Sequence, residues 1–130
     1  MLTKKRVLEM FEEERDLFVK TFPDVDDVGL KIVARHFKKN PIRRDLAWYD
    51  TSDRCVYLVK SGLERSLACL RGVIRHELGH AADVKIKESG AEARADKLAF
   101  IATKHPILYT EEGLQHTTHG KEGRPKWLHQ

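Results

Sequence analysis

The sequence predicts a single α+β domain in which a small, mostly antiparallel sheet packs on two consecutive helices and follows an N-terminal helix. Two patterns support this fold class. Apolar residues recur at helical spacing near the N-terminus and again between about residues 61 and 100, whereas residues 28–34 and 46–60 have the alternation or composition of strands. The 130 residues suffice for one hydrophobic core, so we expect one domain over residues 1–130.

The first predicted element is a helix over residues 4–21, which ends at Phe22-Pro23 because proline cannot continue a helix. Its apolar positions have the spacing of one helix face: Val7, Leu8, Met10, Phe11, Leu17 and Phe18.

Residues 28–34 alternate between apolar and other side chains, which predicts a strand. Residues 46–49 and 54–60 then predict a hairpin, because the four residues between them are typical of turns. We expect the strand 54–60 to lie at the edge of a cleft, where a peptide could pair with its backbone. Trp48 and Tyr57 are candidates to line that cleft, although aromatic strand residues are more often part of a core.

A long helix is predicted next, beginning at the capping-box pattern Ser61-Gly62-Leu63-Glu64. Its apolar residues fall on one face, opposite His76: Leu63, Leu67, Leu70, Ile74, Leu78 and Ala81. We therefore expect His76 and His80 to point away from the core.

His76 and His80 flank Glu77 in an H-E-x-x-H motif within this helix. Residues four apart on a helix share a face, so the two imidazoles can bind one ion. Glu77 would then lie beside that ion, where a base for a metal-bound water belongs. The alternative is that both histidines are merely solvated or hydrogen-bonded on the helix surface.

Catalytic zinc takes three protein ligands and keeps a fourth position for water, so a third ligand is needed. Glu92 is the leading candidate, because it lies on a second helical run that follows His80 closely enough to fold back antiparallel. Asp96 is one turn further on and could accept a hydrogen bond from a ligand imidazole. Ser89-x-x-Glu92 also fits a capping box, so the alternative is that Glu92 only caps the helix.

His76-Glu77-Leu78-Gly79-His80, followed by Glu92-x-x-x-Asp96, resembles the gluzincin clan of zinc metallopeptidases, and most closely its minimal forms, the minigluzincins. The resemblance covers about residues 45–105. It implies that His76, His80 and Glu92 bind Zn²⁺, that Glu77 is the general base and acid, and that Asp96 anchors a ligand. It also implies that such proteins can be latent, with the cleft covered by their own chain.

The function expected from the motif is hydrolysis of peptide bonds by a zinc-bound water that Glu77 activates. Residues 106–130 are a candidate regulatory tail, whose histidines or terminal carboxylate could displace that water. A homodimer formed by exchange of this tail is a further hypothesis. Tyr109, His116 and His119 are weak candidates for a group that stabilises the oxyanion.

Two other functions remain open. His119-Gly120 resembles the downstream His-Gly of SprT-like DNA-associated proteases, in which a histidine is the third ligand; here that would be His119. The domain could also be a zinc-binding regulator that does not cut its partner.

The composition indicates a globular and not a disordered protein, because 41% of the residues are hydrophobic and 34% are charged. The sequence has no apolar run of about 18 residues, and residues 1–6 do not read as a signal sequence, so we expect a cytoplasmic protein without a membrane partner. Cys55 and Cys69 are expected to be reduced thiols. The net charge of +4 is modest, and we interpret the basic pairs at 38–39 and 43–44 as solvated loop charges, so a nucleic-acid partner is not expected. The expected partner is a peptide or protein substrate.

Overall fold

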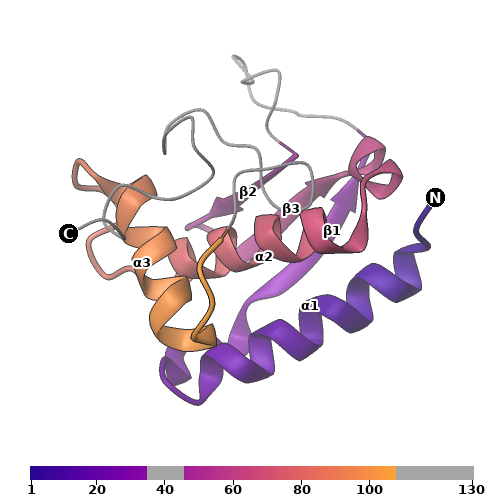
Figure 1. Cartoon of the computed structure of the whole chain (residues 1–130). Helices are drawn as coiled ribbons and strands as arrows, with labels where there is room; N and C mark the ends of the chain where they lie inside the picture. Colours follow the sequence, from indigo (N-terminus) through magenta and orange to yellow (C-terminus); the bar gives the residue numbers. More distant parts are fainter. Residues whose placement is uncertain (35–45, 108–130) are drawn as a thin grey trace.

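The computed structural model describes residues 1–34 and 46–107, and it shows an α+β fold with three helices and a small mixed sheet. Figure 1 shows helix α2 crossing in front of the sheet, with α1 running below it and α3 packed across one end of it. The predicted class is therefore confirmed in its coarse form. Within these residues, no helix has both the length and the apolar character that crossing a membrane requires.

Helix α1 spans Lys4–Val19, and the Thr3 side chain caps it by accepting a hydrogen bond from the Arg6 backbone N–H. Four of the predicted apolar positions are fully buried: Val7, Met10, Phe11 and Phe18. Leu8 is exposed instead, and the buried set includes a charged residue, Glu14. After α1 the chain makes a 3₁₀ turn over Pro23–Asp27.

The sheet consists of β1 (Gly29–Val33), β2 (Ala47–Asp50) and β3 (Cys55–Val59), in the order β1-β3-β2. The hairpin of β2 and β3 is antiparallel as predicted, but β1 pairs with β3 in parallel. The sheet is therefore mixed and not mostly antiparallel. In sequence, β2 follows β1 but lies at the opposite edge of the sheet, and β3 then pairs between them. The central strand β3 is therefore parallel to β1 and antiparallel to β2.

The central position of β3 corrects the expected cleft edge, because an interior strand has no free backbone groups to offer a peptide. Trp48 and Tyr57 stack on each other with ring centroids 5.2 Å apart, in a small cluster with Val59. Strand neighbours point to opposite faces, and the neighbours of these aromatic residues, such as Tyr49 and Val56, pack against the main core instead. Trp48 and Tyr57 are therefore core residues on the face away from α2.

Helix α2 spans Leu67–Ala82 and begins later than predicted, because residues Lys60–Glu64 form a separate 3₁₀ turn. Ser66, and not Ser61, is the N-cap: its hydroxyl accepts a hydrogen bond from the Cys69 backbone N–H at 3.0 Å. The predicted stripe packs as expected at its centre, where Leu70, Ile74 and Leu78 are fully buried.

Helix α3 spans Ala91–Thr103, and its N-cap is Gly90 in the left-handed region at φ 82°. No side chain caps this helix start, so the interpretation of Ser89-x-x-Glu92 as a capping box is wrong. The carboxylate of Glu92 instead contacts His76 and His80 of α2.

Candidate metal centre

The histidine face of α2 is covered by α3, so the alternative in which both histidines are merely solvated on the helix surface is wrong. His76 is 1% exposed, Glu77 6% and His80 9%. Packing this close is allowed by Gly79, where an added Cβ would lie only 2.9 Å from the Cα of Ala95 on α3. Helix α2 is therefore buried on two sides, by the sheet and α1 on one and by α3 on the other.

The contact between α2 and α3 brings His76, His80 and Glu92 together. One carboxylate oxygen of Glu92, Oε2, lies 2.6 Å from Nε2 of His76 and 2.8 Å from Nε2 of His80. One potential ligand atom from each of the three residues lies within 4.8 Å of the others. The side chain of Glu92 is 46% exposed, so solvent reaches this group from the side of the carboxylate.

These donors fit a divalent metal ion such as Zn²⁺. A tetrahedral zinc ion with bonds of about 2.0–2.1 Å spaces its ligand atoms about 3.3 Å apart. The two distances from the Glu92 oxygen to the imidazole nitrogens are shorter than this spacing by less than about 1 Å, so the carboxylate would have to move outward to admit the ion. Two imidazoles and one carboxylate form a set that zinc accepts in catalytic sites.

Asp96 contacts the imidazole of His76 on the side away from Glu92. Its Oδ1 accepts a hydrogen bond from Nδ1–H of His76 at 2.7 Å, and its side chain is fully buried. This contact fixes the ring orientation and leaves Nε2 facing Glu92. Nδ1 of His80 is also buried, but within residues 1–34 and 46–107 it has no hydrogen-bond partner. The two imidazoles are thus held unequally.

The carboxylates strongly change the acid–base behaviour of the group. Burial alone would lower the pKa of His76, but the hydrogen bonds to Asp96 and Glu92 and the nearby charge of Glu77 outweigh it and raise that pKa to about 10. Burial would raise the pKa of Glu92, but the hydrogen bonds from His76 and His80 outweigh it and lower that pKa well below its ordinary value. Without a metal ion, a proton on His76 supplies positive charge to these carboxylates.

The short connection between α2 and α3 is fixed by a residue that the sequence analysis did not single out. The guanidinium of Arg94 donates to the Asp83 carboxylate at 3.0 Å and to the backbone carbonyls of Ser89, Lys85 and Glu88 at 2.6, 2.7 and 3.0 Å. Arg94 thereby closes the connection into a compact loop, and Glu92, two residues earlier on α3, is presented to the histidines.

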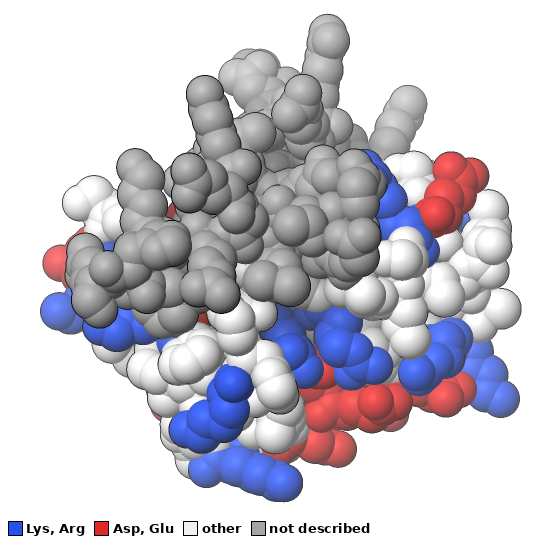
Figure 2. All heavy atoms as spheres, in the orientation of Figure 1, with Lys and Arg blue, Asp and Glu red and all other residues white. Residues whose placement is uncertain are grey.

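A buried ion cluster attaches α2 to α1 on the opposite side. Glu14 of α1 accepts hydrogen bonds from Arg71 at 2.6 Å and from Arg75 at 2.8 and 3.1 Å. Figure 2, drawn in the orientation of Figure 1, shows basic side chains directly beside a band of acidic ones on the lower part of the visible surface. Arg75 precedes His76, so this cluster helps to set the position of the helix that carries the motif.

The other sequence-based candidates lie elsewhere or outside the described residues. Cys69 is buried, but it does not belong to the group of potential ligands. Two groups of candidates fall outside the described part of the chain. These are the tail beyond residue 107, which includes Tyr109, His116 and His119, and the basic pairs at 38–39 and 43–44. The proposals for latency, tail exchange, oxyanion stabilisation and a histidine third ligand therefore stay predictions.

Comparisons of the chain with protein-family models, with curated proteins and with solved structures find no match.

Proposed function

We propose that this protein is a zinc-dependent metallopeptidase of the gluzincin type, with His76, His80 and Glu92 as metal ligands and Glu77 as the catalytic base. One observation carries the proposal: three donor atoms from two helices converge, and the buried carboxylate of Glu77 belongs to the same helical turn as the two histidines. Zinc held there would acidify a water molecule and polarise a peptide carbonyl.

The residues of the chain supply the remaining steps. Glu77 accepts a proton as the water attacks the carbonyl carbon, and it returns a proton to the nitrogen of the leaving amine as the C–N bond breaks. Asp96 keeps Nε2 of His76 directed at the metal position by accepting a hydrogen bond from Nδ1–H. The exposed side of Glu92 is where an extended substrate would approach.

The proposal is tested by metal content and peptidase activity, measured on the same preparations. Wild-type protein is expected to bind one zinc ion and to cleave an unstructured protein such as casein, with loss of activity in chelator and recovery with Zn²⁺. Glu77→Gln is expected to keep the zinc and lose turnover by at least 10²-fold, the lower range for a lost proton-transfer catalyst. His80→Ala and Glu92→Ala are expected to lose both.

The same measurements separate a peptidase from a zinc-binding regulator. Stoichiometric zinc without hydrolysis would favour the regulator. Full activity in Glu77→Gln would contradict the mechanism, and full zinc affinity in Glu92→Ala would contradict the ligand set.

A further inference from the structure

A cavity of about 590 Å³ lies beside His80, between the turn that joins β2 to β3 and the connection that joins α2 to α3. Its volume falls within the range of about 300–1,000 Å³ that is usual for ligand sites. His80 contributes to its wall, so a peptide bound across the metal position would place one of its side chains in this space.

The walls of the cavity combine apolar surface with a few polar groups. Tyr49, Ala81 and Ile86 provide the apolar part. Tyr49 lies on β2 next to Trp48 but points to the opposite face of the sheet, so strand alternation brings it to this side. In the turn, the Ser52 hydroxyl is already bonded to Asp50 at 2.6 Å, which leaves the Thr51 hydroxyl as the nearby polar group.

Two of the charged groups around the cavity are already compensated. Arg54 forms an ion pair with Asp27 at 2.9 Å, outside the cavity, and Asp83 forms one with Arg94 at 3.0 Å. Neither group therefore offers a full charge to a ligand.

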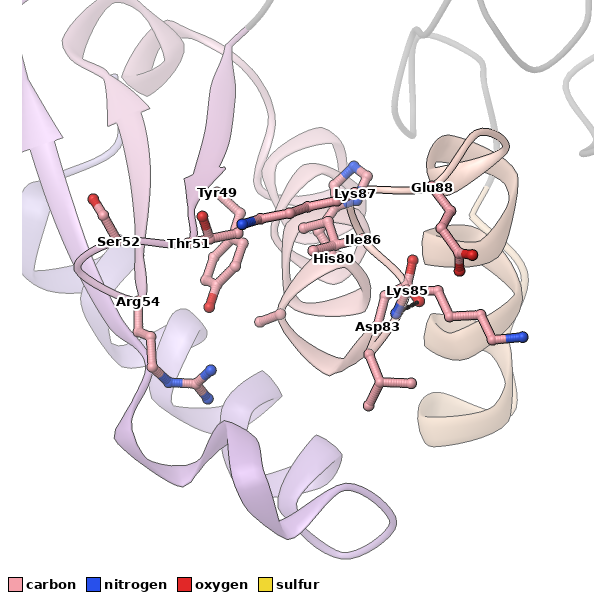
Figure 3. Close-up of a pocket in the computed structure, with 12 residues that line it drawn as sticks. Tyr49, Thr51, Ser52, Arg54, His80, Asp83, Lys85, Ile86, Lys87 and Glu88 are labelled. Atoms are coloured by element: carbon pink, nitrogen blue, oxygen red, sulfur yellow. Dashed lines mark hydrogen bonds between the residues drawn. The ribbon is translucent and has the colours of Figure 1, made fainter.

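Lys87 differs from them. Figure 3 shows its side chain extending from the α2–α3 connection toward Thr51, whereas the carboxylate of Glu88 and the ammonium of Lys85 lie on the far side, over α3. Among the described residues, Lys87 forms no ion pair. Lys87 thus lines the cavity with an ammonium that has no ion-pair partner in the described part of the chain.

We propose that this cavity binds an acidic side chain of the peptide substrate, and that Lys87 is the residue that determines this specificity. The inference rests on the proposed peptidase function. A glutamate side chain would lay its methylene groups against Tyr49 and Ile86 and accept hydrogen bonds from the Lys87 ammonium and the Thr51 hydroxyl. A glutamine of the same shape would keep the apolar contact and lose the charge.

The test uses pairs of fluorogenic peptides that differ only by Glu or Gln, placed in turn at each of the three residues on either side of the cleaved bond. Wild-type zinc protein is expected to show about tenfold higher kcat/KM for the Glu peptide at one of these positions, as for a hydrogen bond to a charged group. Lys87→Arg is expected to keep this preference, and Lys87→Glu to reverse it. Lys20→Glu makes the same change in net charge at the exposed end of α1 and is expected to alter nothing.

A binding arm separates failure of the inference from failure of the peptidase proposal. The zinc-loaded Glu77→Gln variant is titrated with the same peptides, labelled for fluorescence anisotropy, with and without Lys87→Glu. If wild-type protein cleaves no peptide, the peptidase proposal fails, but tighter binding of a Glu peptide that Lys87→Glu abolishes still supports an acidic-peptide site. Equal binding and equal cleavage of Glu and Gln peptides, or a preference that survives Lys87→Glu, would overturn the inference.

Discussion

A Cβ added at Gly79 of α2 would lie 2.9 Å from the Cα of Ala95 on α3 and closer still to its carbonyl oxygen, so the two helices pack at a distance that only glycine permits. Glu92 and Asp96 lie on the same helix as Ala95 and contact the two histidines that flank Gly79. The small residue inside the H-E-x-x-H motif therefore sets the distance between the candidate metal ligands of the two helices.

The first prediction concerns this approach. Gly79→Ala forces α3 outward, so we expect a loss of about 1–3 kcal/mol in the free energy of unfolding, the usual cost of overpacking, together with weaker zinc binding. Urea denaturation and competition with a chelator measure the two effects. Gly29→Ala is the control, because its Cβ would meet Cys55 Sγ at an ordinary 3.4 Å. Unchanged stability and zinc affinity in Gly79→Ala would contradict the helix contact described above.

The second prediction concerns the connection that Arg94 organises. Arg94→Gln removes most of its hydrogen bonds to Asp83 and to three backbone carbonyls, so Glu92 is held less firmly and zinc affinity should fall by about tenfold, as for other residues that support a ligand. Arg6→Gln is the control, because among the described residues the Arg6 side chain makes only an exposed ion pair with Glu13. Equal zinc affinities in the two variants would show that Arg94 does not position the ligand.

Asp96 supports the third prediction. Asp96→Asn replaces the charged carboxylate that accepts a hydrogen bond from Nδ1–H of His76 with a neutral amide. The imidazole of His76 then becomes less basic at Nε2 and is less firmly oriented. We expect about a 10–100-fold loss of zinc affinity. A cobalt-substituted protein provides an independent measurement, since its visible spectrum should shift with the ligand field. Asp16→Asn, an exposed position on α1, should leave both readouts unchanged.

The fourth prediction is the pH dependence of the metal-free protein. The pKa of His76 is raised from 6.5 to about 10 on folding, so its contribution to stability is complete below pH 6.5 and is lost as the pH rises from 6.5 to 10. The pKa of Glu92 is lowered from 4.5, so its contribution is present above pH 4.5 and is lost as the pH falls below that value. Together these groups favour the folded state most between about pH 4.5 and 6.5.

Thermal unfolding of metal-free protein is therefore expected to show a falling Tm between pH 6.5 and 10, and saturating zinc should flatten this slope because the ion displaces the proton. His105→Gln removes an exposed histidine and should keep the slope. A Tm that stays constant from pH 6.5 to 10 without metal would rule out the proton-bridged arrangement of His76, Glu92 and Asp96.

The fifth prediction compares two neighbouring glutamates of α1. Glu14 is buried and paired with Arg71 and Arg75, so Glu14→Gln should lower the free energy of unfolding by about 2 kcal/mol, within the range for hydrogen bonds to charged groups. Glu13 is exposed and pairs loosely with Arg6 and Arg71, so Glu13→Gln should cost about 0–1 kcal/mol. Chemical denaturation of both variants checks the difference. Equal losses would show that burial of Glu14 contributes nothing.

The order of the elements and most of the candidate metal site could be predicted from the sequence, because both depend on local periodicity. Helical spacing alone places His76 and His80 on one face, and the interval to Glu92 is long enough for one reversal of the chain. The start of α2 was predicted incorrectly, because Ser61-x-x-Glu64 and Ser66 offer competing caps and only the packing of the 3₁₀ turn decides between them.

Tertiary structure alone decided how these pieces meet. The position of β3 between β1 and β2 depends on which edge the chain crosses to, and no local pattern records that choice. The hydrogen bonds of Arg94 to Asp83 and of Arg75 to Glu14 join residues 11 and 61 positions apart, so their energy arises only after the helices have packed. The burial of His76 likewise depends on the packing of α3 against α2. Local periodicity fixes which residues share a face, whereas the partner of each face is fixed by packing across the whole core.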